Sequence, residues 1–205
     1  MKRYLILAAA VALALSACKQ ETTVEAPMAA ADPAPATPPV TEPVVPAEPA
    51  VVVAPASQAS FTGYGDMKLG STLEQAKTAW AGELQESKPA EGSTCHYLMP
   101  KWVSKASEFG FMVEEGKFVR YDVGTDKEIA PGGGKVGMSV EELQKLYGGA
   151  LKASPHKYTQ GGQYLSMDAG DVAPTRLVFE VDAAGKVTSW RVGLSPQVEY
   201  VEGCS

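Results

Sequence analysis

The strongest constraint on the fold is a pattern that occurs twice, at positions 69–80 and 136–147. Each copy starts with an apolar residue and a glycine, and continues with an apolar stripe at helical spacing. Landmarks further along repeat in the same order, which predicts two copies of one supersecondary unit that bury their apolar faces together. The repeated landmarks are Tyr97-Leu98 with Tyr164-Leu165, Glu115-Gly116-Lys117 with Ala184-Gly185-Lys186, and Gly124 with Gly193.

Each copy is expected to begin with a short helix. Thr72 with Gln75, and Ser139 with Glu142, have the spacing of a capping box, in which two side chains satisfy the free amides of a helix start. Gly82 and the glycine pair at 148–149 are expected to end the two helices.

Strands are expected to follow each helix. Leu177, Phe179 and Val181 lie on one alternate face of 177–182, and Thr188, Trp190 and Val192 on one face of 188–192, which predicts a hairpin with its turn near Gly185. The segments 109–113 and 118–123 predict the same hairpin in the first copy. The predicted fold is therefore α+β: two tandem α-β-β-β repeats, about 61–130 and 131–205, that form one antiparallel sheet with the helices on one face.

A segment rich in Pro, Ala, Val and Glu precedes the repeats, at 18–58. Proline fixes φ and lacks an amide donor, so neither helix nor sheet is expected there. Polyproline II advances about 3.1 Å per residue, so this linker reaches roughly 120 Å when extended. The folded domain is thereby limited to 59–205, which is long enough for one core.

The first residues look like an export signal. Two basic residues, Lys2 and Arg3, precede an apolar run that is shorter than the about 20 residues needed to span a bilayer. The run ends in Leu15-Ser16-Ala17-Cys18, which resembles the bacterial lipobox. That resemblance implies cleavage after residue 17 and attachment of acyl chains, including palmitate, to Cys18. An ordinary signal peptide that ends at Ala17 is the alternative.

The resemblance to a lipobox also bears on the membrane to which the protein is sorted. Inner-membrane retention of a lipoprotein would require Asp after the lipidated cysteine, and this chain has Lys19. We therefore expect an exported protein that is anchored to the periplasmic face of the outer membrane. Membrane contact is expected only through lipidated Cys18, because no other apolar stretch is long enough to span.

The net charge argues against nucleic-acid binding, and the cysteine content indicates a disulfide. The formal net charge is −6, and no region is basic enough to indicate nucleic-acid binding. Once Cys18 carries lipid, Cys95 and Cys204 remain, and two thiols in an oxidising compartment usually pair. A disulfide between them is expected; a reactive thiol at Cys95 beside His96 is the alternative.

Motifs of catalysis and metal binding are incomplete. The Gly-Gly-Gly-Lys run at 132–135 lacks the spacing of a phosphate loop and is expected to join the repeats. A calcium loop that begins at Asp168 would place Phe179 at position 12, where a glutamate is required. His156 is expected in a surface loop, and Glu199 and Glu202 at an exposed edge. We predict no catalytic residue, no metal and no cofactor.

Aromatic residues are the remaining candidates for a binding role, because Trp and Tyr are favoured as anchors in interfaces. Their number exceeds what one small core needs to bury. The wider set is Tyr64, Tyr97, Trp102, Tyr121, Tyr158, Tyr164, Trp190 and Tyr200. The residues chosen as partner-binding candidates are Tyr97, Tyr121, Tyr158, Tyr164 and Trp190.

The opening motif of each repeat resembles a structural group that includes the β-lactamase inhibitory proteins and the small lipoprotein of the β-barrel assembly machine. The resemblance implies a concave antiparallel sheet, lined with aromatic residues, that grips a loop of an enzyme. The chain departs from that group in its shorter repeats, each with one helix. The residues that carry the resemblance are Leu69-Gly70-Ser71-Thr72-Leu73-Glu74 and Val136-Gly137-Met138-Ser139-Val140-Glu141.

The expected function is that of a non-enzymatic envelope lipoprotein that binds a protein partner. The more specific form of this hypothesis is inhibition of an envelope hydrolase, either lysozyme-like or a β-lactamase. The alternative is an assembly or scaffold factor of the outer membrane. An enzyme is the less favoured interpretation.

Overall fold

The protein is described by a computed structural model that covers residues 57–170 and 174–204. The chain divides into two units, 1–50 and 51–205, and all the described residues belong to the second. The predicted signal peptide, Cys18 and nearly all of the linker lie outside the described residues. Within the described part of the chain, no helix is both long and apolar enough to cross a membrane.

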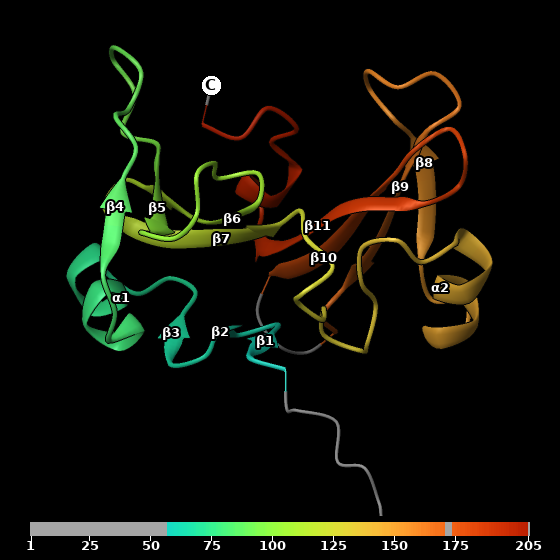
Figure 1. Cartoon of the computed structure of the whole chain (residues 1–205), viewed down its shortest axis with the longest axis horizontal. Helices are drawn as coiled ribbons and strands as arrows, with labels where there is room; N and C mark the ends of the chain where they lie inside the picture. Colours follow the sequence, from blue (N-terminus) through green and yellow to red (C-terminus); the bar gives the residue numbers. More distant parts are fainter. Residues whose placement is uncertain (1–56, 171–173, 205) are drawn as a thin grey trace, which may run out of the picture. The chain divides into compact units, whose positions relative to one another are not determined.

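The main body is an antiparallel sheet of eight strands (Figure 1). The strands are β4 (Leu84–Glu86), β5 (His96–Pro100), β6 (Phe109–Glu114), β7 (Lys117–Val123), β8 (Lys152–Pro155), β9 (Gln163–Asp168), β10 (Thr175–Val181) and β11 (Val187–Leu194). Their order across the sheet is β4-β5-β6-β7-β11-β10-β9-β8. The last strand of each half, β7 and β11, therefore pair at the centre.

Three smaller elements complete the architecture. A second sheet consists of β1 (Ala59–Ser60), β2 (Gly63–Tyr64) and β3 (Met67–Lys68), in that order. The two α-helices are α1 (Leu73–Trp80) and α2 (Val140–Leu146), and the 3-10 helix η1 (Gln197–Glu199) lies near the C-terminus. The protein is thus mostly β, with two short helices.

The predicted antiparallel sheet is confirmed, but the prediction of three strands after each helix is wrong. Four strands follow each helix, and the three-stranded sheet was not predicted. The missed strands β4 and β8 lie at the sheet edges, and β8 is exposed along its whole length. An edge strand with no buried face has no apolar alternation, so its sequence lacks the usual signal.

Both predicted capping boxes form. The backbone N–H of Gln75 donates to Thr72 Oγ1 (3.3 Å), and the Thr72 N–H donates to Gln75 Oε1 (2.9 Å). Ser139 and Glu142 make the same pair of bonds at 3.2 and 2.7 Å. Two amides of each helix start are satisfied in this way.

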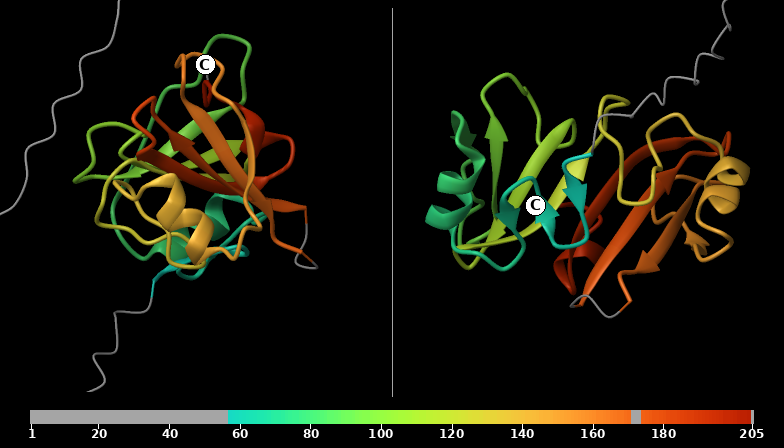
Figure 2. Two further views of the ribbon diagram at one scale, coloured as in Figure 1. Left: turned by 90° about the vertical axis from the view of Figure 1, so that its right-hand side faces the viewer. Right: turned by 90° about the horizontal axis from the view of Figure 1, so that it is seen from below.

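The helices cover one face of the large sheet. Ala76 of α1 and Leu143 of α2 are fully buried in the same apolar cluster as Phe111 and Trp190 of the sheet. Figure 1 shows both helices on the same side of the sheet, and Figure 2 shows β1–β3 between them. This layer, here called the helix face, contains the main hydrophobic core.

Two tyrosine hydroxyls attach the small sheet to the rest of the domain. Tyr121 donates to the Ser60 carbonyl (2.7 Å), and Tyr64 donates to Glu128 Oε2 (2.6 Å). The rings of Tyr64 and Tyr121 also meet edge to face, with centroids 5.6 Å apart. Burial raises the pKa of both hydroxyls above the ordinary value for tyrosine.

The predicted disulfide is confirmed. Cys95 and Cys204 are bonded, with their Cα atoms 5.2 Å apart and 109 positions apart in the chain. The bond joins the start of β5 to the C-terminus. A bond of this kind is typical of exported proteins, since the cytosol keeps thiols reduced.

The buried tyrosines predict a loss of stability in alkali. The raised folded-state pKa means that the native protein keeps protons that the unfolded chain releases above pH about 10. The stabilisation is complete below that pH and is lost as the pH rises through the folded pKa. Urea unfolding above pH 10 should show a steep decline in the free energy of unfolding. Tyr64→Phe should reduce that slope by up to about 1.4 kcal/mol per pH unit. An identical slope in the variant would contradict the prediction.

Removal of the disulfide should destabilise the domain. Cys95→Ser combined with Cys204→Ser frees a loop of more than 100 residues in the unfolded chain, which costs about 4 to 5 kcal/mol at most in the chain-entropy model. The midpoint of urea unfolding should fall accordingly. Equal midpoints for the double variant and the oxidised protein would show that the bond is energetically silent.

Candidate functional site

The second face of the large sheet is crossed by the end of the chain. Residues 195–204, here called the C-terminal strap, lie on the side opposite the helices (Figures 1 and 2). They cover a small apolar cluster in which Met112 and Val119 of the sheet are buried. The face that the family resemblance implied to be open is therefore occupied by the chain itself.

Arg120 of β7 binds the side of the strap that faces the sheet. Its guanidinium donates to the carbonyls of Gln197 (2.9 Å) and Tyr200 (2.6 Å). It also donates to Asp122 through Nε and Nη2 (3.0 and 2.7 Å) and to the Tyr97 hydroxyl (3.1 Å). The residue is only 3% exposed, and all five of its N–H donors are bonded within the protein.

The groups around Arg120 keep both the guanidinium and the Tyr97 hydroxyl protonated. Burial alone would lower the pKa of Arg120, but the adjacent Asp122 carboxylate raises it overall, so the guanidinium stays charged. The Tyr97 hydroxyl donates to Asp122 Oδ2 (3.2 Å). Burial, followed by the charge of Asp122, raises the pKa of that hydroxyl, so Tyr97 is a donor at neutral pH.

Arg191 of β11 is the second buried arginine, only 4% exposed. Its Nε donates to the Val198 carbonyl (2.7 Å), and its Nη1 pairs with Glu180 of β10. The register of β7 and β11 places Arg191 directly opposite Asp122. Arg120, Asp122, Glu180 and Arg191 together are here called the polar floor.

His156 and Tyr164 lie beside the polar floor. Their rings stack with centroids 4.5 Å apart, and the Arg191 guanidinium lies 5.7 Å from the Tyr164 ring. The backbone N–H groups of Tyr158 and Thr159 donate to His156 Nδ1 (3.1 and 3.0 Å), so this nitrogen is an acceptor. The ring thereby holds its own loop in place, in line with the predicted loop position of His156.

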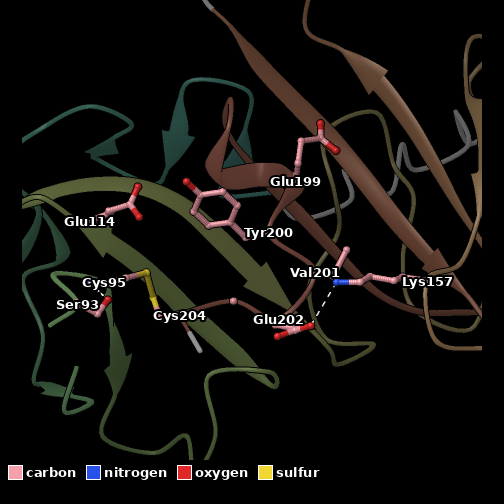
Figure 3. A pocket seen from close by; sticks show the side chains of 10 residues that line it. Ser93, Cys95, Glu114, Lys157, Glu199, Tyr200, Val201, Glu202 and Cys204 are labelled. Atoms are coloured by element: carbon pink, nitrogen blue, oxygen red, sulfur yellow. Dashed lines mark hydrogen bonds and ion pairs between the residues drawn. A yellow bond between two sulfur atoms is a disulfide. The ribbon is translucent and has the colours of Figure 1, made fainter. Parts of the chain in front are cut away.

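Two hollows border residues 201–203 of the strap. One, about 350 Å³, is lined by Glu114, Lys157 and Glu199 together with the disulfide end of the strap (Figure 3). The other, about 310 Å³, lies over the polar floor and is also lined by Ser107 and Ser189. Charged and polar side chains line both, and both depend on the strap for a wall.

Surface ion pairs fix the outer side of the strap. Lys157 reaches Glu202 (3.3 Å), as Figure 3 shows, and the Tyr158 hydroxyl bonds to the same carboxylate. Arg176 pairs with Glu199 (2.5 Å) and with Asp168 (2.7 Å), and its guanidinium lowers the pKa of the Asp168 carboxyl. Glu199 and Glu202 are both exposed, as predicted.

A separate candidate lies on the helix side of the molecule. Trp102, in the loop between β5 and β6, is 71% exposed and stacks on buried Phe109 (5.9 Å between centroids, 19° between planes). A hollow of about 570 Å³ separates it from Trp80, and a smaller one, about 130 Å³, reaches Glu128. Trp102 and Phe109 are here called the aromatic platform.

The five partner-binding candidates fall into three groups. The prediction is wrong for Tyr121 and Trp190. Both are fully buried in the helix-face core, so neither can contact a partner in the folded chain. Tyr97 and Tyr164 are half-buried beside the polar floor. Tyr158, in the connection between β8 and β9, is 59% exposed, and its hydroxyl contacts Glu202 of the strap.

Trp102 was part of the wider aromatic set but was not selected. It stands between Lys101 and Val103 in a connection, where no alternation tells which side chains are buried. The only sequence signal is its position just after Pro100, at the end of a predicted strand. Among residues 57–170 and 174–204, no group of three or more His, Cys, Asp or Glu is arranged to hold a metal.

No protein-family model matches the chain, and no curated protein matches it by sequence. One similar solved structure is the uncharacterized protein yfeY from Escherichia coli, with 16% identity and a TM-score of 0.45 over 67% of this chain and 99% of that one. Another is an extracellular protein containing a SCP domain from Bacillus anthracis, with 12% identity and a TM-score of 0.40, over 62% and 44% of the two chains. The similarity assigns no family.

The polar floor predicts that Arg120 is critical for stability. Arg120→Met leaves the half-buried Asp122 carboxylate without its counter-charge and two strap carbonyls without their donor, which should cost about 3 to 5 kcal/mol of unfolding free energy. The strap should also exchange its amide hydrogens faster. Arg176→Met is the matched control, because its ion pairs are exposed and each is worth about 1 kcal/mol or less. Equal losses in the two variants would refute this role.

Proposed function

We propose that the protein is a non-enzymatic lipoprotein of the cell envelope that binds a protein partner through the aromatic platform. One observation carries the proposal: a large indole is exposed to solvent and yet held in place by stacking on a buried ring. Tryptophan is enriched at the energetic centres of protein interfaces. A ring that is already immobilised loses little conformational entropy on binding.

The surroundings of the platform also suit a protein contact. Apolar surface at Trp80 lies across the larger hollow, and the Glu83–Lys101 ion pair (3.3 Å) borders it. An apolar centre with charged groups at its edge is the usual arrangement of a protein interface. The partner's side chain that enters this hollow is therefore expected to be apolar.

An envelope hydrolase, lysozyme-like or a β-lactamase, is the first partner class in this proposal, and its inhibition is the expected effect. The concave-sheet grip of the inhibitory proteins is unsuited to this chain, since the strap fills that face. The contact is instead expected at the loop that carries Trp102. An assembly or scaffold role at the outer membrane is the alternative, and it would use the same surface.

The location is part of the proposal. A lipid on Cys18 and the linker 18–58 would hold the domain up to roughly 120 Å from the periplasmic face of the outer membrane. The sequence pattern at 1–18 supports the anchor. The Cys95–Cys204 bond supports export, since disulfides persist in oxidising compartments.

We also propose that the domain arose by internal duplication. The contacts of the two helix starts support this. Gly70 N–H donates to the Phe118 carbonyl (2.7 Å), and Gly137 N–H donates to the Val187 carbonyl (2.9 Å). Isolated bridges join Thr72 with Lys117, and Ser139 with Lys186. Each half thus fastens its helix start to its own last hairpin, although only the first half carries the platform.

The platform predicts a specific loss of binding. Partners of the lipoprotein, captured by cross-linking in its own envelope and identified by mass spectrometry, should be lost when Trp102 is changed to Ala. A hot-spot tryptophan contributes at least 2 kcal/mol, so affinity for the captured partner should fall about 30-fold or more. Urea unfolding should show little change in stability, because the side chain is exposed.

Tyr158→Ala is the matched control, because it removes another exposed aromatic residue at the opposite end of the sheet. It should leave the captured partner bound. Enrichment of one soluble hydrolase would favour the inhibitor form, and enrichment of barrel-assembly components would favour the scaffold form. Partners retained by Trp102→Ala and lost by Tyr158→Ala would overturn the platform proposal.

A further inference from the structure

The two arginines of the polar floor are bonded unequally. A guanidinium has five N–H donors. Arg120 uses all five on protein acceptors, whereas Arg191 uses one at Nε, to Val198, and one at Nη1, to Glu180. The other three donors of Arg191 have no acceptor among residues 57–170 and 174–204. Arg191 nevertheless is only 4% exposed, and it lines the hollow of about 310 Å³.

The difference in the number of bonded donors between Arg120 and Arg191 needs a physical reason. Burying a charged group is costly unless its donors are satisfied. The strap carbonyls, Asp122 and Tyr97 together satisfy all five donors of Arg120, so its role is structural. Arg191 lines a cavity, and a planar carboxylate bound there can accept two parallel N–H bonds from a guanidinium. A bound carboxylate would therefore satisfy two of the three remaining donors of Arg191.

A simple anion is a poor match for the whole hollow, because carboxylates also line it. Asp122 lies opposite Arg191 in the strand register, and Glu180 and Glu202 face the same space. A simple cation is a poor match as well, because two guanidinium groups line the cavity. The lining favours a ligand that carries both charges a few ångströms apart.

The size of the hollow limits the ligand further. About 310 Å³ lies at the lower end of the range of small-molecule sites, roughly 300 to 1,000 Å³. Ser107 and Ser189 add hydroxyl groups, and Val201 adds apolar surface, which suits a short side chain. The compact molecule with adjacent carboxylate and ammonium groups and a short side chain is an α-amino acid.

We propose that this hollow is a binding site for a free α-amino acid. The carboxylate binds the unused donors of Arg191, and the ammonium group lies among Asp122, Glu180 and Glu202. The strap residues 201–203 form one wall, so the strap builds a ligand site as well as closing the sheet face. The site is separate from the aromatic platform and does not depend on the proposed protein partner.

Calorimetric titration of the detergent-solubilised lipoprotein with L-alanine tests the proposal. Saturable binding to one site is expected at millimolar or lower concentration. Acetate and methylammonium, which each supply one of the two charges, should bind at least tenfold more weakly. No saturable heat with L-alanine at millimolar concentration would overturn the proposal. Equal affinity for acetate would also overturn it, because the site would then be an anion site.

Variants in one exposed loop locate the site without breaking a buried ion pair. Ser107→Trp places a large ring at the hollow and should abolish L-alanine binding. Ser104→Trp, three positions earlier in the same exposed loop and not a lining residue, should leave binding unchanged. Unfolding of both variants in urea checks that they fold. Binding that survives Ser107→Trp would place the ligand elsewhere and refute the proposal.

Trp102→Ala separates this proposal from the protein-binding function. L-Alanine affinity should be unchanged in that variant, since Trp102 does not line the hollow. A parallel loss of L-alanine binding and of the captured partner would mean that one site serves both, which would contradict the separation proposed here.

Discussion

The pairing of β7 with β11 is the contact on which the remaining structure depends. It joins the two halves of the chain into one sheet, with Trp190 opposite Val123 and Gly193 opposite Arg120. Because side chains alternate along a strand, this register sends Trp190 to the core and Arg120 and Arg191 to the strap face. Gly193 is required at this point, since a Cβ there would lie 2.8 Å from the Arg120 Cβ. A shift of either strand by one residue would turn the arginine of that strand towards the hydrophobic core.

The position of the strap depends on the register of β7 and β11. Two arginines fixed on one face of the central strands need acceptors, and the carbonyls of Gln197, Val198 and Tyr200 supply them. These bonds and the disulfide hold a segment with little regular structure against the sheet. The buried charges are thus compensated by backbone groups that would otherwise need water. The strap in turn removes the sheet face as a general binding surface and leaves two polar hollows beside it.

Local signals allowed much of the fold to be predicted from the sequence. The capping boxes depend on residues three apart, and the hairpins depend on alternation within a few residues, so neither requires knowledge of distant contacts. The disulfide followed from cysteine count and compartment. The edge strands β4 and β8 were missed because they bury little, and the strap was missed because its contacts are with distant side chains. Tyr121 and Trp190 were misjudged because alternation indicates two faces but does not say which one is solvated.

The two candidate surfaces lie on opposite sides of the sheet, and this has a mechanical consequence. Trp102 stacks on Phe109, which belongs to the helix-face core, whereas the hollow over the polar floor lies under the strap. A protein held at Trp102 would therefore leave the hollow accessible. The connection from Pro100 to Phe109 nevertheless contributes to both surfaces, with Trp102 at its start and Ser107 near its end. A ligand that orders Ser107 would act on the same loop that presents Trp102, so this loop is a physical path by which one occupant could affect the other.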